Sequence, residues 1–237
     1  MIKAVFFDWY GTLVHWKPER IQILDEAYAE YGIRFDPKKL TKAIAVAEEQ
    51  VPEGNPLKWE ESEDKGRYIR YQEILLFEHG ISLPKEQILR AIKLLREIAN
   101  TATTVLYEDV LPTLDSLKDK GYILGLLTNI ERGTKFNYRE LGLGEYFDTV
   151  VTSDDVGAKK PKAPIFILAL SRANVNPDEA IYVGDQYESD VVGARGVGIN
   201  PVLIDRRDLF RWAADCQRIR SLTELLDYLQ IHRKGNV

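Results

Sequence analysis

The sequence is poor in the residues that build disulfides and most transition-metal sites. Among its 237 residues are one cysteine, Cys216, and three scattered histidines. A single cysteine excludes an internal disulfide framework and a cysteine-based zinc site. The chain also lacks a run of about 18 apolar residues, which a membrane-spanning helix requires. The apolar part of its N-terminus is too short for a signal peptide, so we expect a cytoplasmic protein that does not act at a membrane.

Positive charge is also in short supply. Lysine and arginine total 32 against 37 aspartates and glutamates, which gives a net charge of −5. Binding to a nucleic-acid backbone requires clustered lysines and arginines, so a nucleic-acid partner is not expected. The length suits one large domain or one domain with an insertion. Nothing in the sequence indicates an oligomeric state.

Strand and helix patterns alternate in most of the chain. Residues 2–7 are an apolar run that ends at Asp8, which is typical of a buried strand leading into a turn. Further strands are expected at 122–127, 148–152, 180–184 and 200–204, and helices at 110–120, 131–142, 163–174, 187–196 and 222–231. This order predicts an α/β fold, a Rossmann-like, doubly wound parallel sheet with helices on both faces.

One long segment has a different pattern, with apolar residues at helical spacing throughout. Four helices are expected in it, at 18–31, 37–50, 62–79 and 85–100. Proline and glycine mark the breaks between them. We therefore expect two domains: an α/β core made of residues 1–14 and 106–237, and an inserted all-helical domain made of residues 15–105.

Polar residues follow the predicted strands at the edge where open parallel sheets bind ligands. They are Asp8, the pair Thr128 and Asn129, Lys160, and the pair Asp185 and Asp190. Each alone has a plain structural interpretation, because aspartate and threonine-asparagine pairs are common in turns and helix caps. Their convergence on one edge instead indicates a site that combines a nucleophile, polar donors, a cation and further carboxylates.

With these polar residues at the predicted strand ends, the sequence resembles the haloacid dehalogenase superfamily over nearly its whole length. Four motifs carry the resemblance: Asp8-Trp9-Tyr10-Gly11-Thr12-Leu13-Val14, Leu127-Thr128-Asn129, Lys160-Pro161, and Gly184-Asp185-Gln186-Tyr187-Glu188-Ser189-Asp190. The helical insert after the first motif is similar to the cap of that family.

The resemblance implies a catalytic set. Asp8 stands where the family keeps a nucleophile that forms a covalent aspartyl intermediate. A transferring phosphoryl group needs donors and positive charge around it. The resemblance gives those parts to the Thr128 hydroxyl, the Asn129 amide and the Lys160 ammonium.

The resemblance also implies Mg²⁺, which prefers oxygen ligands. Asp8, Asp185 and the Tyr10 backbone carbonyl are the implied ligands, with Asp190 ligating directly or lying in the outer shell. Gly11 and Thr12 would then turn the chain and bring backbone N–H groups to the phosphate.

Position 10 departs from the pattern of the family's phosphatases, which keep an aspartate there as general acid and base. Tyr10 is a poor substitute, because a phenol is a weak base at neutral pH. The first motif is thereby similar to that of the 2-haloacid dehalogenases, whose halide leaving group needs no proton. The carboxylates of the fourth motif favour the phosphatases instead, because without a cation they would repel one another. Glu188 is a candidate replacement for the missing acid.

The metal-dependent phosphatase is therefore the favoured expectation, with a small phosphorylated molecule as substrate. A 2-haloacid dehalogenase is the alternative. Two further alternatives are a phosphonoacetaldehyde hydrolase and a binding protein that has lost its catalytic activity. Substrate contacts from the insert are expected at Lys58 and Trp59, which lie in a segment broken by proline and glycine.

Overall fold

The computed structural model describes residues 1–51, 65–130 and 138–234. The chain divides into two compact units, one formed by Met1–His15 with Val105–Val237 and the other by Trp16–Thr104. Each unit has its own hydrophobic core. Among the described residues, no helix combines the length and the apolar character needed to cross a bilayer.

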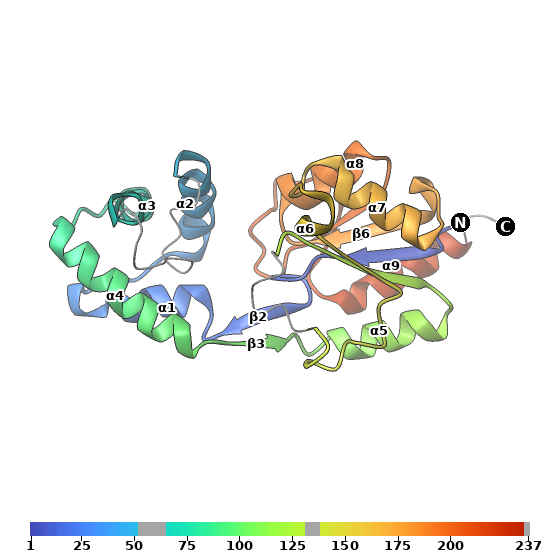
Figure 1. The fold of residues 1–237 in the computed structure, drawn as a ribbon, viewed down its shortest axis with the longest axis horizontal. Coiled ribbons are helices and arrows are strands. Elements are labelled where there is room, and N and C mark those ends of the chain that lie inside the picture. Colours follow the sequence, from blue (N-terminus) through green and yellow to red (C-terminus); the bar gives the residue numbers. More distant parts are fainter. Residues whose placement is uncertain (52–64, 131–137, 235–237) are drawn as a thin grey trace. The chain divides into compact units, whose positions relative to one another are not determined.

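The larger unit contains a six-stranded sheet in which all neighbouring strands run parallel (Figure 1). Its strands are β1 (Ala4–Phe7), β4 (Ile123–Thr128), β5 (Thr149–Thr152), β6 (Ala180–Gly184), β7 (Asn200–Ile204) and β8 (Gln217–Ile219). Their order is β5-β4-β1-β6-β7-β8, so the first strand lies at the centre. The predicted α/β fold is confirmed.

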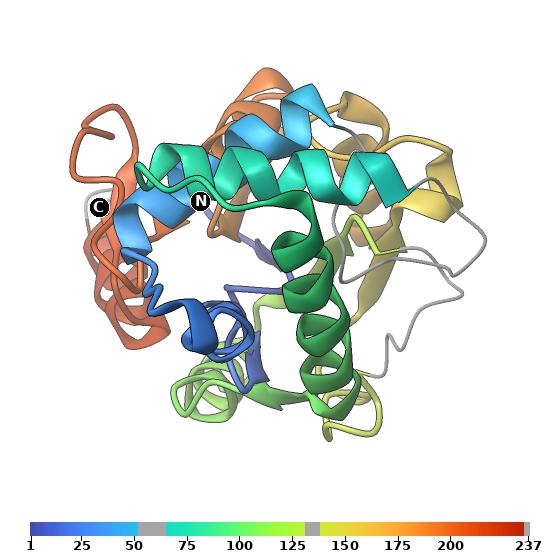
Figure 2. The ribbon, with the colours of Figure 1, turned by 90° about the vertical axis from the view of Figure 1, so that its left-hand side faces the viewer.

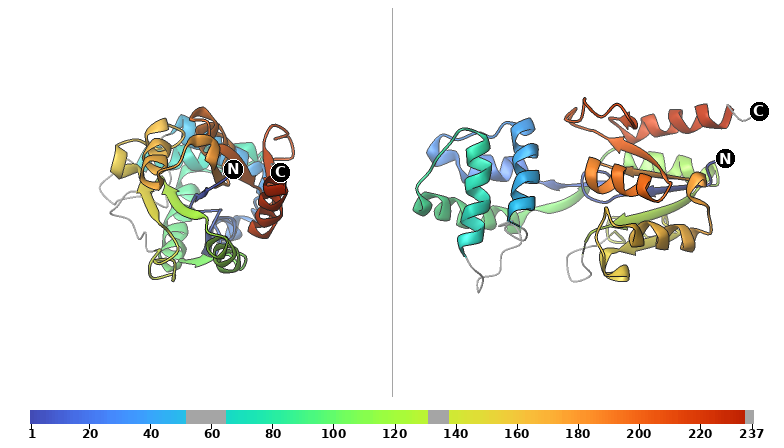
Figure 3. Two further views of the ribbon diagram at one scale, coloured as in Figure 1. Left: turned by 90° about the vertical axis from the view of Figure 1, so that its right-hand side faces the viewer. Right: turned by 90° about the horizontal axis from the view of Figure 1, so that it is seen from above.

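Helices cover both faces of this sheet, as Figure 1 and the right-hand view of Figure 3 show. On one face lie α5 (Val110–Asp119) and α9 (Leu222–Lys234); on the other lie α6 (Ser153–Val156), α7 (Ala163–Ala173) and α8 (Gly193–Gly196). Alternate residues of β1 serve the two layers: Val5 and Phe7 belong to the core that includes α5 and α9, whereas Ala4 and Phe6 pack in the core that includes α7. Such alternation is the ordinary pleat of a strand buried on both faces.

Two predicted helices of this unit differ in detail. The predicted helix at 187–196 begins as a π-helix, Tyr187–Val192, and continues as α8. Of the predicted helix at 131–142, residues 131–137 lie outside the described residues. The remainder, 138–142, forms turns and not a helix, so that part of the prediction is wrong. Gly142, at a φ of +79°, accommodates a turn that other residues would resist. A short 3₁₀ turn, Pro177–Glu179, precedes β6.

The smaller unit is built from helices (Figure 2). They are α1 (Arg20–Ala27), a 3₁₀ turn (Ala29–Tyr31), α2 (Pro37–Gln50), α3 (Lys65–Glu78) and α4 (Lys85–Thr101). In it α2 packs along α3, and α1 packs along α4. The predicted start of the third helix, 62–64, lies outside the described residues. Tyr28, Tyr68 and Tyr71 are fully buried here and fill the core between the helices.

The chain passes from one unit to the other, and back, through the strands of a two-stranded sheet. Its strands are β2 (Val14–Lys17) and β3 (Thr103–Leu106), and the division between the units falls within both of them.

Candidate functional site

The polar residues expected at the strand ends do lie at one edge of the sheet. Asp8 follows β1, Thr128 ends β4, and Asp185 follows β6. Because β1 lies between β4 and β6, the three positions are neighbours. The Asp8 N–H donates to the Val183 carbonyl at 2.9 Å, which fixes the exit of β1 against β6. The fold therefore brings together at this edge residues from motifs that are distant in the sequence.

Lys160 supplies the positive charge among these carboxylates. Its Nζ lies 2.5 Å from Asp8 Oδ1, 2.7 Å from Asp190 Oδ1 and 2.7 Å from the Tyr182 hydroxyl. The side chains of Lys160 and Asp190 are each only 2% exposed, and that of Asp8 is 12% exposed. An ammonium group has three N–H donors, and these three acceptors use all of them. The ammonium is therefore held in a single orientation beside Asp8.

Asn129 holds the backbone of Lys160. Its Oδ1 accepts from the Lys160 N–H at 2.7 Å, and its Nδ2 donates to the Lys160 carbonyl at 3.2 Å. The side-chain amide therefore helps to position the lysine, and the substrate contact expected from the sequence stays a prediction. Thr128 is buried, and its Oγ1 accepts from the Ile130 N–H at 3.3 Å.

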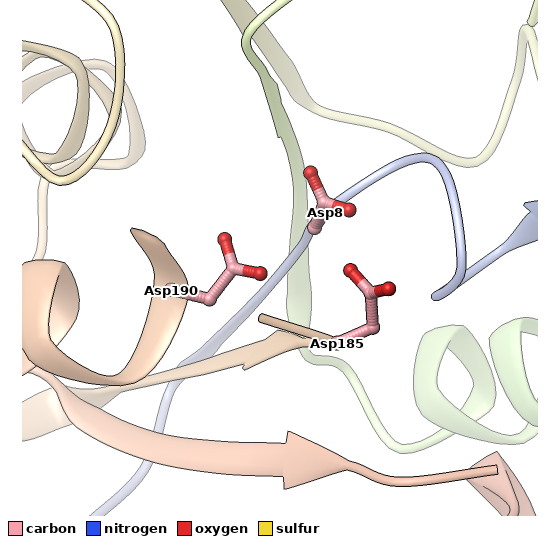
Figure 4. A group of neighbouring side chains, drawn as sticks. All are labelled: Asp8, Asp185 and Asp190. Atoms are coloured by element: carbon pink, nitrogen blue, oxygen red, sulfur yellow. The ribbon is translucent and has the colours of Figure 1, made fainter. Parts of the chain in front are cut away.

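Asp8, Asp185 and Asp190 bring their carboxylates around one small space (Figure 4). Oxygen atoms of the three groups lie within 4.8 Å of one another. Asp190 is fully engaged, since Oδ1 accepts from Lys160 and Tyr182 while Oδ2 accepts from the Gln186 N–H at 3.0 Å. Asp185 differs, because its buried Oδ1 has no hydrogen-bond partner within the described part of the chain.

The local helix accounts for part of Asp190, whose Oδ2 accepts from the Gln186 N–H at its start, but not for Asp185. The π-helix that follows β6 begins after Gln186, and no side chain caps it. A π-helical turn is rare and is often found at functional sites. Within the described residues, no hydrogen bond therefore supports the interpretation of Asp185 as a helix cap.

Glycines let the backbone approach these carboxylates. A Cβ on Gly11 would lie 2.1 Å from Asp185 Oδ2, and a Cβ on Gly184 would lie 2.3 Å from Asp190 Cγ. Gly11 also has a φ of +80°, which few other residues adopt. Its N–H donates to the Val14 carbonyl at 2.8 Å, so the amide that we expected to face a phosphate is engaged within the loop.

The electrostatics of the site follow from burial and like charge. Burial raises the pKa of Asp8 to about 6, with the Asp190 charge adding to the effect and Lys160 opposing it. Burial raises the pKa of Asp185 well above its usual range, and the charges of Asp8 and Asp190 act in the same direction. Burial alone would lower the pKa of Lys160, but the neighbouring carboxylates overcome that effect and raise it. The site thus holds a permanent cation beside two carboxyl groups, Asp8 and Asp185, that resist ionisation.

Tyr182 is a site residue that the sequence analysis missed. Its hydroxyl accepts from Lys160 Nζ and donates to Asp190 Oδ1 at 3.1 Å, and its ring packs against Phe166. Burial, followed by the charges of Asp190 and Asp8, raises the pKa of the phenol well above its usual value. The signal in the sequence was a hydroxyl within the otherwise apolar strand Ala-Ile-Tyr-Val-Gly.

The other predicted site residues have varied positions. Tyr10 is partly buried and forms an isolated bridge with Val14. Thr12 is buried, and its Oγ1 lacks a hydrogen-bond partner among the residues that the structure describes. Glu188 is exposed. Lys58 and Trp59 lie outside the described residues.

The comparison with protein families decides the relationship. The sequence matches the haloacid dehalogenase-like hydrolase family over residues 2–198. The chain belongs to this family. It is therefore a hydrolase with the α/β core of that family, and the resemblance drawn from the four motifs is confirmed.

Individual relatives carry more specific names. A glyceraldehyde 3-phosphate phosphatase of Methanopyrus kandleri is 31% identical over 212 residues, which cover 87% of this chain and 85% of the relative. The crystal structure of a HAD phosphatase from Thermococcus onnurineus matches 96% of this chain and 98% of its own, with a TM-score of 0.59 and 28% identity. A 2-haloacid dehalogenase from Pseudomonas syringae pv. Tomato matches 97% of this chain and 99% of its own, with a TM-score of 0.55. At 23% identity, the likeness to the dehalogenase shows the fold alone.

Proposed function

We propose that this hydrolase is a Mg²⁺-dependent phosphatase that acts on a small phosphate ester or acyl phosphate through a covalent intermediate on Asp8. The observation that carries the proposal is the largely buried group of three carboxylates, among which the described residues place the ammonium of Lys160. The phosphatase names of the relatives with 31% and 28% identity support the same class of reaction.

The residues fit a divalent cation. Three carboxylates face one lysine, so full ionisation leaves an excess of negative charge that a divalent ion would balance. The unpartnered Oδ1 of Asp185 is an oxygen in need of a cation or a donor. In the proposal Asp8, Asp185 and the Tyr10 carbonyl hold the ion, and Asp190, whose oxygens are already engaged, stays in the outer shell. When bound, Mg²⁺ draws charge from the phosphoryl oxygens.

Asp8 performs the covalent step. A carboxylate oxygen of Asp8 attacks phosphorus, and the bond from phosphorus to the leaving oxygen breaks with its electron pair going to that oxygen. Water then attacks the phosphorus of the aspartyl phosphate, which releases inorganic phosphate and restores the carboxylate. Lys160, bonded to Asp8 Oδ1, reduces the repulsion between this carboxylate and the incoming phosphate. Thr128 and the backbone near Thr12 are the proposed donors to the phosphoryl oxygens.

Tyr10 sets the kind of ester that can be cleaved. General acid help is worth about 10²–10⁴-fold, and a phenol at this position is a weak source of it. The proposed substrates are therefore those whose leaving group departs without a proton, such as aryl and acyl phosphates. Tyr10 is also the observation that favours the second candidate, dehalogenation of a 2-haloacid, in which halide leaves unprotonated.

In the proposal, the helical unit is the cap that selects the substrate. We propose the domain division given by the sequence, with residues 15–105 as that cap and with substrate contacts from Lys58 and Trp59. The partner is a small phosphorylated molecule, and the site of action is the cytoplasm.

Turnover of a generic aryl phosphate tests the proposal. The purified protein is assayed with Mg²⁺, with excess chelator, and with Mg²⁺ restored. We expect phosphate release that disappears with chelator and returns with the metal. Full activity in chelator would contradict the metal dependence. Halide release from a 2-haloacid in chelator, without phosphate release from the ester, would replace the proposal by the dehalogenase.

A further inference from the structure

Arg206 connects several segments of the larger unit at the edge of the sheet where Asp8 and Asp185 lie. It follows β7 and projects a guanidinium group that is mostly buried, with a side chain 14% exposed. Nη1 lies 2.8 Å from Asp109 Oδ2, and Nη2 lies 3.0 Å from Asp109 Oδ1. This is the paired geometry in which arginine binds a carboxylate most firmly. The guanidinium also lies over the Tyr107 ring, 3.8 Å from its centroid.

The same guanidinium reaches the loop that follows Asp8. Nη2 donates to the backbone carbonyl of Thr12 at 2.8 Å. A second bond supports this loop, since the Tyr107 N–H donates to the Leu13 carbonyl at 3.1 Å. Arg206 therefore binds the loop directly through Thr12 and packs on the residue that holds Leu13.

Asp109 anchors the arginine to a rigid element. Its Oδ2 also accepts from the Ser221 hydroxyl at 2.7 Å and from the Leu222 N–H at 2.8 Å, at the start of α9. Burial alone would raise the pKa of Asp109, but the hydrogen bonds from Arg206, Ser221 and Leu222 outweigh it, and the pKa is lowered. The carboxylate is thus ionised at neutral pH and joins α9 to the guanidinium.

We propose that Arg206 is a positioning residue that fixes the loop of residues 11–13 against Asp185 by holding the Thr12 carbonyl. The inference rests on the proposed function, because it assigns Arg206 a part in the same site. The clearance in this loop is small, as a Cβ on Gly11 would lie 2.1 Å from Asp185 Oδ2. A shift of the loop by a fraction of an ångström would therefore change the space around the carboxylates. Misplacement of catalytic groups by about 1 Å can cost on the order of 100-fold in rate.

Three variants separate positioning from general stability. Arg206→Ala removes every contact of the guanidinium. Arg206→Lys keeps the charge but cannot reproduce a planar fork that serves both Asp109 and Thr12. Ser221→Ala is the matched control, because it removes a bond to the same Asp109 carboxylate and weakens the cap of α9 without touching Arg206.

The measurements are aryl phosphate turnover, melting temperature and amide hydrogen exchange at residues 11–14. For Arg206→Ala we expect kcat/KM to fall about 10- to 100-fold, mainly through kcat, with faster exchange at residues 11–14. Arg206→Lys should fall between this variant and the native protein. Ser221→Ala should lower the melting temperature but keep the native rate and the native exchange at residues 11–14.

One outcome is that the arginine variants lose no more rate than Ser221→Ala and show unchanged exchange at residues 11–14. That result would show that Arg206 only stabilises the fold. If Arg206→Ala does not fold, the comparison of Arg206→Lys with Ser221→Ala decides. Absence of phosphatase activity in the native protein would refute the proposed function instead. The exchange measurement would then still tell whether Arg206 fixes the loop.

Discussion

Replacing Asp185 by asparagine is expected to stabilise the metal-free protein and to weaken its response to Mg²⁺. Asp185→Asn keeps the shape of the side chain and removes its charge. The ammonium of Lys160 bonds Asp8 and Asp190, so these contacts remain in place. The change therefore isolates the charge of a carboxylate with a buried oxygen that has no partner among the described residues.

The size of the effect follows from the distances. Oxygens of the three carboxylates lie within 4.8 Å of one another. Two unit charges at that separation repel by about 3.5 kcal/mol at an effective dielectric constant of ~20. Asp185 faces two such charges, and Lys160 offsets about one of them. Partial protonation reduces the remainder, so we expect a gain of about 1–3 kcal/mol at pH 7. In a chain of this size each kcal/mol raises the melting temperature by about 2–4 °C.

Mg²⁺ should close most or all of this gap in stability, because it stabilises the native protein more than the variant. An ion present at about 100 times its dissociation constant adds about 2.7 kcal/mol to the native protein. The variant, which lacks a proposed ligand, should gain much less. The assay is thermal unfolding of both proteins in chelator and in Mg²⁺, with Asp227→Asn, at an exposed position on α9, as the control for loss of a carboxylate.

The stability gap between Asp185→Asn and the native protein should depend on pH. Because burial and like charge raise the pKa of Asp185 in the fold, its ionisation destabilises the protein. This loss of stability is absent below pH 3.8, the ordinary pKa of the carboxyl group. It grows as the pH rises from 3.8 towards the raised pKa of Asp185 in the fold. The gap between variant and native protein in chelator should therefore close as the pH is lowered from 7 to about 4. A variant less stable than the native protein in chelator at pH 7 would refute the repulsion argument, and equal stabilisation of both by Mg²⁺ would remove Asp185 from the metal site.

Three further changes test the catalytic assignments. Asp8→Asn should abolish phosphate release in a steady-state assay while circular dichroism stays native, since an amide does not attack phosphorus; more than a trace of turnover would contradict covalent catalysis. Tyr182→Phe leaves one buried N–H of Lys160 without its acceptor, which costs about 1–3 kcal/mol, and we expect kcat to fall about 10-fold with little change in KM; an unchanged kcat would show that the hydroxyl only fills space. Tyr10→Asp should raise turnover of alkyl phosphates about 10-fold or more and that of aryl phosphates little, measured as log rate against leaving-group pKa. A flat plot for the native protein would mean that another residue already supplies the proton.

The strands that form the site could be predicted because local composition and burial agree there. β1, β4, β6 and β7 are nearly continuous apolar runs, as strands buried on both faces must be, and their predicted ranges match within two residues. β8 was missed because Gln217–Ile219 is short and mostly polar, and only its pairing with β7 makes it a strand. The same holds for β2 and β3, which pair across a long stretch of sequence.

The contacts within the site were less predictable than its residues. Strand ends show which side chains share an edge, and that was enough to group Asp8, Lys160 and Asp185. The amide of Asn129 suits a phosphate, and that contact stays a prediction; its bonds to the Lys160 backbone are seen only in the folded chain. Arg206 carried no signal, because its partners Thr12 and Asp109 are identified only once the chain is folded.

One glycine joins the first motif to the fourth, and a second glycine shapes the fourth motif itself. Gly11 and Gly184 each occupy a place where a Cβ would overlap a carboxylate, that of Asp185 in one case and that of Asp190 in the other. The turn after Asp8 therefore fits closely against Asp185, and the end of β6 fits closely against Asp190. This fit depends on backbone and glycine and not on the side chain at position 10. Tyr10 can therefore replace an acid without disturbing the proposed nucleophile and metal ligands, which is why we attribute to it a change in leaving-group preference and not a loss of the reaction.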